Sequence, residues 1–333
     1  MYAFAIWVTT NCNMKCSYCY EGNEKENSLL RADMADKIIS FITQKIGKSS
    51  DTTIIEFHGG EPLLNFPIIK YIVEKLEGEY SQYKFIYGIT TNGTICTPKI
   101  IKFLTSYCTY SLTVSIDGTE VVHNSNRMLK NGEPTYNLAL KTAKMLQEVR
   151  SDVRIRMTVL PGNVKELADG IIKFVNMGFK IIIPVLDYFN HDWNKKDIDL
   201  IAQELRNIKK YIEGNTKFSN VKIAMISDQK KNLGQCGGGN NSFHIIPNGD
   251  IYPCAYSVGN EVEKIGSVMS GIEQKKIELL NEIYCSTNIE CDGCGNYESC
   301  ISSRCKFLNR CVTGEYNKPI PLICAMENMK MLL

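Results

Sequence analysis

Short runs of β-branched and aromatic residues alternate with amphipathic segments along the first two thirds of the chain. The runs that we expect to form strands are Ala3–Thr9, Thr53–Phe57, Lys84–Thr90, Ser111–Ile116, Val153–Val159 and Lys180–Val185. Strands that alternate with helices predict an α/β fold with a parallel sheet and right-handed crossovers. Six β/α units would form an open, partial (β/α)6 barrel of the TIM type, with its active site at the carboxyl ends of the strands.

Four of the intervening segments have clear helical patterns. They are Arg31–Lys45, Ile68–Leu76, Leu167–Met177 and Asp197–Ile212. In the first, apolar residues recur at helical spacing, at Met34, Ile38 and Ile42. Pro67 suits the first turn of the second helix, because its fixed φ favours a helix start. Asn163, with Glu166 three residues later, predicts a capping-box-like start for the third.

The pattern changes after Lys230, where helical periodicity gives way to short hairpins and cysteine-rich loops. We expect Ser242–Ile246 and Ile251–Tyr252 to pair across a turn at Asn248-Gly249, and Gln229–Asn232 to be a solvated loop. At about 150 residues per domain, the length favours two domains. We therefore predict a barrel over residues 1–215, and a linker with a cysteine-rich domain over residues 216–333.

Composition and charge narrow the class of protein. Lys and Arg number 38 against 36 Asp and Glu, a net charge of +2, which lacks the strongly basic character typical of nucleic-acid binders. No apolar run approaches the ~18 residues of a membrane span. The start of the chain lacks the features of a signal peptide. A cytoplasmic protein is expected, in which the 14 cysteines are metal ligands rather than disulfides.

The first cysteines form a compact group directly after the first predicted strand. Cys12, Cys16 and Cys19 follow the spacing C-x3-C-x2-C. Three thiolates on one short loop can hold three irons of a [4Fe–4S] cluster and leave the fourth iron open. A structural zinc ion is the alternative, but zinc takes four ligands and no fourth lies nearby in the sequence.

This spacing, with the aromatic Tyr18 before the last cysteine, resembles the signature of the radical SAM superfamily. Further elements follow successive predicted strands: a GGEP-like segment at Gly59, an Asn-Gly pair at Asn92, and Ser115 with Arg127 beyond it. Taken singly, the glycine pairs are also typical of turns. The S-adenosylmethionine-binding residues that the resemblance implies are Tyr18, Gly59, Gly60, Glu61, Asn92, Ser115, Arg127 and Leu186.

The later cysteines resemble the SPASM domain of radical SAM peptide and protein maturases, which holds two auxiliary [4Fe–4S] clusters. The resemblance assigns one cluster to Cys291, Cys294, Cys300 and Cys324, and three ligands of the other to Cys236, Cys254 and Cys305. The four residues between Cys300 and Cys305 depart from the family spacing of three. Either Cys285 or Cys311 is a further ligand, or an iron stays open to a substrate thiolate. A zinc ribbon is the alternative for Cys291 and Cys294 alone.

The two isolated cysteines, Cys96 and Cys108, are expected to be buried and to pack as small apolar residues.

By resemblance, the enzyme would cleave S-adenosylmethionine to a 5′-deoxyadenosyl radical. The radical would abstract hydrogen from a ribosomally made peptide, with formation of a thioether or carbon–carbon cross-link. Asp187 and Tyr188 follow the sixth strand and are weak candidates to face the substrate. The reductant would be a flavodoxin or ferredoxin. Because Met1 runs straight into the first strand, a leader peptide would be recognised by a separate protein or by the barrel surface, or the peptide would have no leader at all.

Three alternatives remain at this point. Formylglycine formation, as in sulfatase maturases, is disfavoured by Ala255, which stands where those enzymes have the proposed aspartate base. A radical dehydrogenase of a small molecule would use the same cofactor. A non-catalytic iron–sulfur electron carrier would not need the elements after the second, third and fourth strands.

Overall fold

Two compact units divide the chain in the computed structural model, which describes residues 1–22, 27–227 and 232–330. The first comprises Met1–Asn13, Glu21–Leu112 and Cys236–Cys285. The second comprises Met14–Tyr20, Thr113–Gln235 and Ser286–Leu333. Of the expected solvated loop Gln229–Asn232, only Asn232 lies within the described residues.

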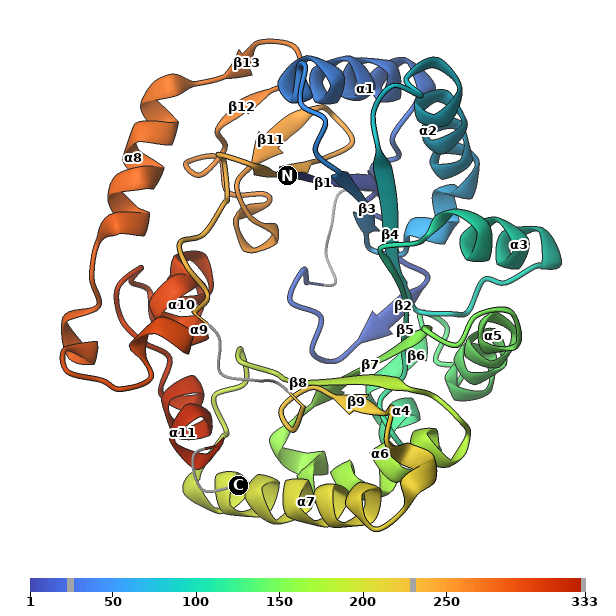
Figure 1. Ribbon diagram of the computed structural model, residues 1–333, viewed down its shortest axis with the longest axis vertical. Helices are drawn as coiled ribbons and strands as arrows, with labels where there is room; N and C mark the ends of the chain where they lie inside the picture. The colour runs from blue at the N-terminus through green and yellow to red at the C-terminus, as the bar shows by residue number, and fades with distance from the viewer. Residues whose placement is uncertain (23–26, 228–231, 331–333) are drawn as a thin grey trace. The chain divides into compact units, whose positions relative to one another are not determined.

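Parallel strands with one antiparallel extension form the sheet of the first unit (Figure 1). Its strands are β1 (Tyr2–Thr9), β3 (Thr53–Gly59), β4 (Phe85–Thr91), β10 (Ser242–Ile245), β11 (Asp250–Tyr252), β12 (Gly266–Ser267) and β13 (Gly271–Ile272). The order is β13-β12-β11-β10-β1-β3-β4. β10 is parallel to β1 and antiparallel to β11. The first three predicted strands and the predicted hairpin are confirmed.

One face of this sheet is covered by helices. The unit contains α1 (Ala32–Ile46), α2 (Phe66–Glu79), α3 (Pro98–Tyr107), α8 (Gln274–Cys285) and the short η1 (Pro62–Asn65) and η4 (Ala255–Ser257). β1 is buried on both of its faces from Phe4 to Thr9, as is typical of a central parallel strand. Phe4 packs edge-on against Phe41 of α1, with the ring centroids 6.4 Å apart. Pro67 lies in the first turn of α2, as predicted.

The second unit contains a further parallel sheet region and a small antiparallel ribbon. β7 (Arg154–Val159) lies between β5 (Ser111–Ser115, of which residues 113–115 belong to this unit) and β8 (Ile181–Leu186), and β9 (Lys222–Ile223) follows β8. β2 (Met14–Cys16) pairs antiparallel with β6 (Arg127–Leu129). The remaining predicted strands are confirmed within one or two residues.

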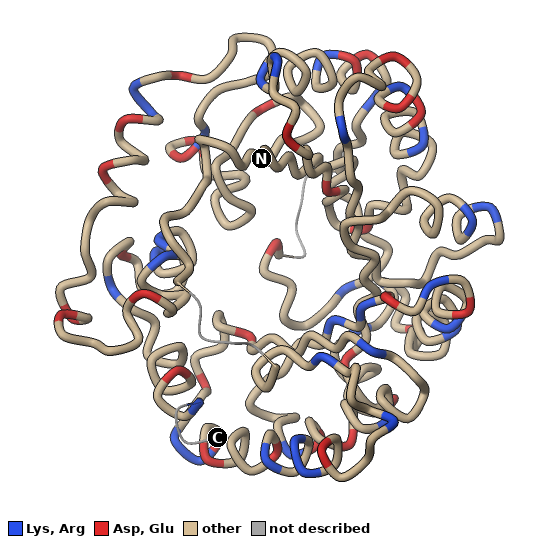
Figure 2. The backbone as a smooth tube through the Cα atoms, in the orientation of Figure 1, with Lys and Arg blue, Asp and Glu red and all other residues tan. Residues whose placement is uncertain are grey.

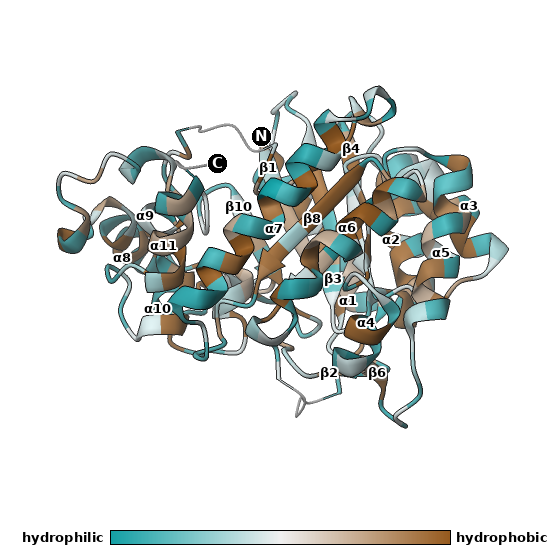
Figure 3. Cartoon of the chain, turned by 90° about the horizontal axis from the view of Figure 1, so that it is seen from below, coloured by the Kyte–Doolittle hydropathy of each residue, from teal (hydrophilic) through white to brown (hydrophobic). Residues whose placement is uncertain are grey.

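The second unit's helices follow these strands and fill its C-terminal part. They are α4 (Glu120–Asn126), α5 (Tyr136–Val149), α6 (Leu167–Asn176), α7 (Lys195–Glu213), α9 (Ile301–Arg304), α10 (Lys306–Thr313), α11 (Pro321–Lys330) and the 3₁₀ turns η2 (Pro161–Glu166), η3 (Thr216–Phe218), η5 (Ile289–Cys291) and η6 (Tyr297–Ser299). α7 buries Ile201, Leu205 and Ile208, and bands of apolar and polar residues run along it (Figure 3). Charges of both signs alternate along the same helix (Figure 2).

The start of α6 differs from the predicted capping box. Pro161 begins the 3₁₀ turn η2, because its φ is already set for a helical start. Asn163 therefore lies inside this turn, where its Oδ1 accepts a hydrogen bond from the Leu160 amide at 2.8 Å. Glu166 makes no side-chain cap. The Ala168 amide in the first turn of α6 instead donates to Glu204 of α7 at 2.9 Å.

None of the helices in the described part of the chain has the length and apolar character needed to cross a membrane.

Candidate functional site

Two glycines at the end of β3 bring the backbone of the first unit into close contact with the loop that carries Cys12. A Cβ atom added at Gly59 would lie 1.9 Å from the Thr9 carbonyl oxygen. One added at Gly60 would lie 2.4 Å from the Asn11 carbonyl oxygen and 2.9 Å from the Cys12 Cβ. Only glycine permits this approach, so these residues fix the path of the Cys12 loop.

Glu61 ties this loop to the end of β4. Its side chain is almost fully buried, and Oε1 accepts from the Thr91 hydroxyl at 2.7 Å and from the Leu63 amide at 3.0 Å. Its Oε2 accepts from the Asn92 amide at 2.6 Å. Three donors within the protein therefore bind the carboxylate, and in these contacts Glu61 acts as an organiser of the loops.

Asn92 continues the same network toward Cys12. Its Nδ2 donates to Asn13 Oδ1 at 2.9 Å and lies 3.9 Å from Cys12 Sγ. Its Oδ1 accepts from the backbone amide of Thr94. The first unit thus gathers Cys12, Gly59, Gly60, Glu61 and Asn92 at the carboxyl ends of three adjacent strands, as the sequence predicted.

A second group of predicted residues surrounds the β2–β6 ribbon of the second unit. Cys16 is paired with Arg127 across the ribbon. The Tyr18 hydroxyl donates a very short hydrogen bond to Asp117, and one Arg127 Nη donates to the Tyr18 hydroxyl at 2.6 Å. Burial raises the pKa of Asp117, while the adjacent Arg127 opposes that rise. The sequence indicates only a turn at Asp117, so its contact with Tyr18 was missed.

Arg127 is 8% exposed, yet its Nε has no hydrogen-bond partner among the described residues. A buried N–H donor without a partner is costly, because it loses its hydrogen bonds to water. The guanidinium is charged, so the acceptor that suits it best is an anion such as a carboxylate. Ser115, at the end of β5, is also buried. This ribbon therefore presents a cation with an unused donor.

His123 and Thr135 hold the backbone of Arg127. The Thr135 hydroxyl donates to the Arg127 carbonyl at 2.6 Å and lies 2.9 Å from His123 Nε2. His123 Nδ1 accepts from the Asp117 amide at 3.2 Å. Because Thr135 uses its proton on Arg127, Nε2 is the nitrogen that carries the His123 proton. Burial lowers the pKa of His123 to about 3, in agreement with a neutral ring.

The residues after β8 occupy a partly buried turn. Leu186 is buried at the strand end. Asp187 accepts from the Phe189 amide through its side chain and from the Trp193 indole through its carbonyl, and burial raises its pKa. Burial raises the pKa of Tyr188 to about 12, with further contributions from Glu327 and from the cysteines 305 and 300. Tyr188 therefore lies close to the cysteine-rich segment of its own unit.

Four of the predicted cluster cysteines lie together in the second unit. Burial raises the pKa of Cys324 to about 11, and the charges of the other three thiolates, at Cys300, Cys291 and Cys294, raise it further. Within the described ranges, no three His, Cys, Asp or Glu residues converge as they would on a single metal ion. A [4Fe–4S] cube separates its ligands more widely than one ion does, because the inorganic core lies between them.

The other cysteines are divided between the units. Cys236, Cys254 and Cys285 belong to the first unit, and Cys305 and Cys311 to the second. Cys285 and Cys311 are both exposed. Ala255 follows Cys254 at the start of η4. Outside these groups, Cys108 is fully buried as expected, but the expectation for Cys96 was wrong: it lies in the loop before α3 and is half-buried.

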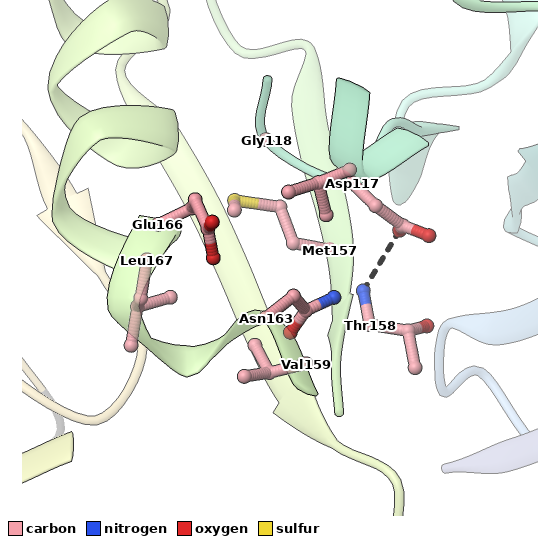
Figure 4. A pocket seen from close by; sticks show the side chains of 9 residues that line it. Asp117, Gly118, Met157, Thr158, Val159, Asn163, Glu166 and Leu167 are labelled. Carbon is pink, nitrogen blue, oxygen red and sulfur yellow. Dashed lines mark hydrogen bonds between the residues drawn. The ribbon is translucent and has the colours of Figure 1, made fainter. Parts of the chain in front are cut away.

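A small cavity lies beside Asp117 and Gly118 in the second unit (Figure 4). It has room for a single water molecule. Asn163 Nδ2 and Glu166 Oε2 are buried beside it with no partner among the described residues. A water bridging these two atoms would satisfy both, and the cavity is too small for a cofactor.

Comparisons with known proteins agree with this geometry. The chain is 25% identical over 324 residues to a cysteine-type anaerobic sulfatase-maturating enzyme of Clostridium novyi, a match covering 88% of this chain and 85% of that enzyme. It is 23% identical to the radical SAM cyclopropyl synthase TigE of Paramaledivibacter caminithermalis, with 88% of this chain and 66% of that one covered.

Solved structures share the fold. The structure of native anSMEcpe with bound AdoMet superimposes with a TM-score of 0.81 at 18% identity, over 99% of this chain and 96% of that one. The structure of SuiB from Streptococcus suis superimposes with a TM-score of 0.69 at 18% identity. This match covers 97% of this chain and 76% of SuiB. Residues 6–175, just over half of the chain, match the family model described as Radical SAM superfamily. The chain belongs to the radical SAM superfamily.

Proposed function

We propose that this chain is a radical SAM peptide maturase that forms a thioether or carbon–carbon cross-link in a ribosomally made peptide. The observation that carries the proposal is the buried Arg127 guanidinium, whose Nε lacks a partner among the described residues beside the loop of Cys16 and Cys19. Peptide chemistry is supported by the relatives, which include TigE and the subtilosin biosynthesis protein AlbA of Bacillus subtilis. SuiB has also been solved with its precursor peptide SuiA.

The residues present fit the cofactor that the superfamily uses. Arg127 offers an unused donor for the methionyl carboxylate, and the glycine pair at Gly59 would hold the loop of Cys12 in the position that a cluster ligand requires. Ser115 and Leu186 would contact the remainder of the cofactor, and Tyr18 would hold Arg127 in place. Bound S-adenosylmethionine and a reduced [4Fe–4S] cluster at Cys12, Cys16 and Cys19 would supply a radical that abstracts hydrogen.

A SPASM-type domain with two auxiliary clusters completes the proposal. One cluster would be held by Cys291, Cys294, Cys300 and Cys324. Their proximity supports this assignment, because the other three thiolates add to the effect of burial in raising the pKa of Cys324. The second cluster would use Cys236, Cys254 and Cys305, with Cys285 or Cys311 as a possible fourth ligand. In this arrangement residues 1–215 form the partial barrel and residues 216–333 the linker and auxiliary-cluster domain.

The proposed enzyme requires a reductant, such as a flavodoxin or ferredoxin, and a peptide. Asp187 and Tyr188 would face the peptide, with Tyr188 close to the cysteine-rich segment. A separate protein would recognise a leader, if the peptide carries one.

Formylglycine formation is the second candidate, favoured by the similarity to sulfatase-maturating enzymes over most of the chain. Ala255 argues against it, since a methyl group cannot accept the proton that the reaction releases.

Mass spectrometry of peptide products tests the proposal. The reconstituted enzyme is incubated without oxygen with S-adenosylmethionine, dithionite and the short peptides encoded beside its gene. We expect one peptide to lose two hydrogen atoms and to show a fragment ion that contains a cross-link. A cysteine converted to formylglycine in a sulfatase peptide would favour the second candidate. Cleavage of S-adenosylmethionine with every peptide unchanged would contradict both.

A further inference from the structure

Lys306 is a lysine buried in the C-terminal part of the second unit. It begins α10 directly after Cys305, and only 2% of its surface is exposed. Lysine is almost never fully buried without a paired anion, because an ammonium loses much hydration free energy there. The partners of Lys306 therefore call for an explanation.

Three neutral oxygens surround the Lys306 amine. Nζ lies 2.8 Å from the Ser286 carbonyl, 2.6 Å from Asn288 Oδ1 and 2.8 Å from Asn317 Oδ1. Three acceptors need three N–H donors, and only the protonated amine has three. The side chain is thus held as an ammonium, without a carboxylate among these partners.

The orientation of Asn288 is fixed by its other contacts. Its Nδ2 donates to the Ser302 carbonyl at 3.0 Å, so its Oδ1 is the atom that faces Lys306. Asn309 binds the same carbonyl at 2.7 Å, and the Ser302 hydroxyl donates back to Asn309. The ammonium therefore sits in a rigid network that joins residues 286–288 to residues 302–317.

This network borders the four grouped cysteines. The Cys291 amide donates to the Asn288 carbonyl, and the Asn288 side chain also binds the Cys291 thiol. Burial lowers the pKa of Lys306, and the nearby Cys291 opposes that fall. Burial raises the pKa of Cys324 and of Cys300, and the acidic Glu290 and Glu327 raise them further. Glu327 is itself paired with Lys330 at 2.8 Å. A four-thiolate [4Fe–4S] cluster is itself an anion, and it becomes more negative on reduction.

We propose that Lys306 is a fixed cation that tunes the auxiliary cluster held by Cys291, Cys294, Cys300 and Cys324. A positive charge in a low-dielectric interior stabilises the reduced form of an anionic cluster more than the oxidised form, and so raises its reduction potential. Lys306 is in this sense a positioning and tuning residue. The inference rests on the proposed function, which supplies the cluster.

The test is a potentiometric titration followed by electron paramagnetic resonance. It uses the full-length chain with Cys12, Cys16 and Cys19 changed to alanine, so that only auxiliary clusters remain. Two variants remove the effect of the cation in different ways. Lys306→Met deletes the charge, and Asn317→Asp neutralises it with a carboxylate of nearly the same shape. Lys318→Met is the matched control, because Lys318 is an exposed neighbour paired with Glu315.

We expect both variants to shift one cluster to a more negative midpoint potential, while Lys318→Met leaves the potential unchanged. If Lys306→Met fails to assemble the cluster, the midpoint potential of Asn317→Asp tests the inference alone, since this variant keeps the lysine and its hydrogen bonds. Intact clusters with the parent potential in Asn317→Asp would overturn the inference and leave the proposed function standing. A parent chain without any iron–sulfur signal would overturn both the auxiliary clusters and this role.

Discussion

Arg127 and Lys306 are two buried cations in the same unit, and their surroundings differ in one respect. Lys306 has an acceptor for each of its three N–H groups. Arg127 is bound by Tyr18 but keeps a buried Nε without a partner in the described chain. A complete set of partners is typical of a fixed structural charge, whereas an unused buried donor on a cation leaves a position where an anion can bind.

Replacing Arg127 should have the largest effect. Arg127→Met removes the donor for the cofactor carboxylate, so we expect kcat/KM for S-adenosylmethionine cleavage to fall by about 100-fold or more, equivalent to about 3 kcal/mol. Steady-state formation of 5′-deoxyadenosine gives the value. Arg150→Lys is the control, because Arg150 pairs with Asp152 near the surface. Equal activity of Arg127→Met and the parent enzyme would remove Arg127 from the binding site.

Cysteine replacements separate the cluster ligands from the unassigned thiols. Cys324→Ala should lower the iron content by about four atoms per chain, the content of one [4Fe–4S] cluster. Cys108→Ala should leave it unchanged, since Cys108 is fully buried in the loop after α3 and is not among the assigned ligands. The same iron and sulfide assays on Cys285→Ala and Cys311→Ala identify the extra ligand. Full iron in Cys324→Ala would contradict the assigned set.

Gly60→Ala tests the contact that positions the Cys12 loop. The added Cβ would lie 2.4 Å from a backbone oxygen, so the loop must move. We expect a loss of about 2–3 kcal/mol in the free energy of unfolding, and a weaker signal from the N-terminal cluster. Gly162→Ala is the matched control, because nothing lies within 4 Å of the added atom. Equal denaturation midpoints for the two variants would contradict the close approach.

His123 should make the stability of the fold depend on pH. Its pKa is about 3 in the folded chain and about 6.5 when unfolded, so the unfolded state binds more protons between these values. The contribution of His123 to the free energy of unfolding is therefore at its full value above pH 6.5. It falls as the pH drops toward 3, by at most about 1.4 kcal/mol per pH unit. Urea unfolding at several pH values should show a shallower slope for His123→Gln. An identical slope would mean that His123 is not buried in its neutral form.

The strands and loop motifs were predictable because they depend on local sequence. Hydrophobic runs located β1, β3 and β4, and the glycines and Asn92 stand directly after them in the chain. The contact of Tyr18 with Asp117 joins residues 99 positions apart, and Asp117-Gly118 is also a common turn sequence. Periodicity contains no information about such a pair.

The same limit explains the start of α6 and the role of Lys306. Glu204, which caps α6, lies 36 residues beyond the amide that it binds. Nothing in the sequence around it distinguishes it from an exposed helical glutamate. Lys306 likewise has no local signal for its role, since lysine is ordinarily exposed, and only the fold shows that its charge is buried. Polar residues acquire such roles through tertiary packing.

The most direct test of the central claim is the amount of 5′-deoxyadenosine formed without oxygen from S-adenosylmethionine and dithionite. The reconstituted wild-type chain and Arg127→Met are compared at equal content of the cluster at Cys12, Cys16 and Cys19. We expect 5′-deoxyadenosine from the wild-type chain and little or none from the variant. No product from the wild-type chain, or equal product from both, would contradict that claim.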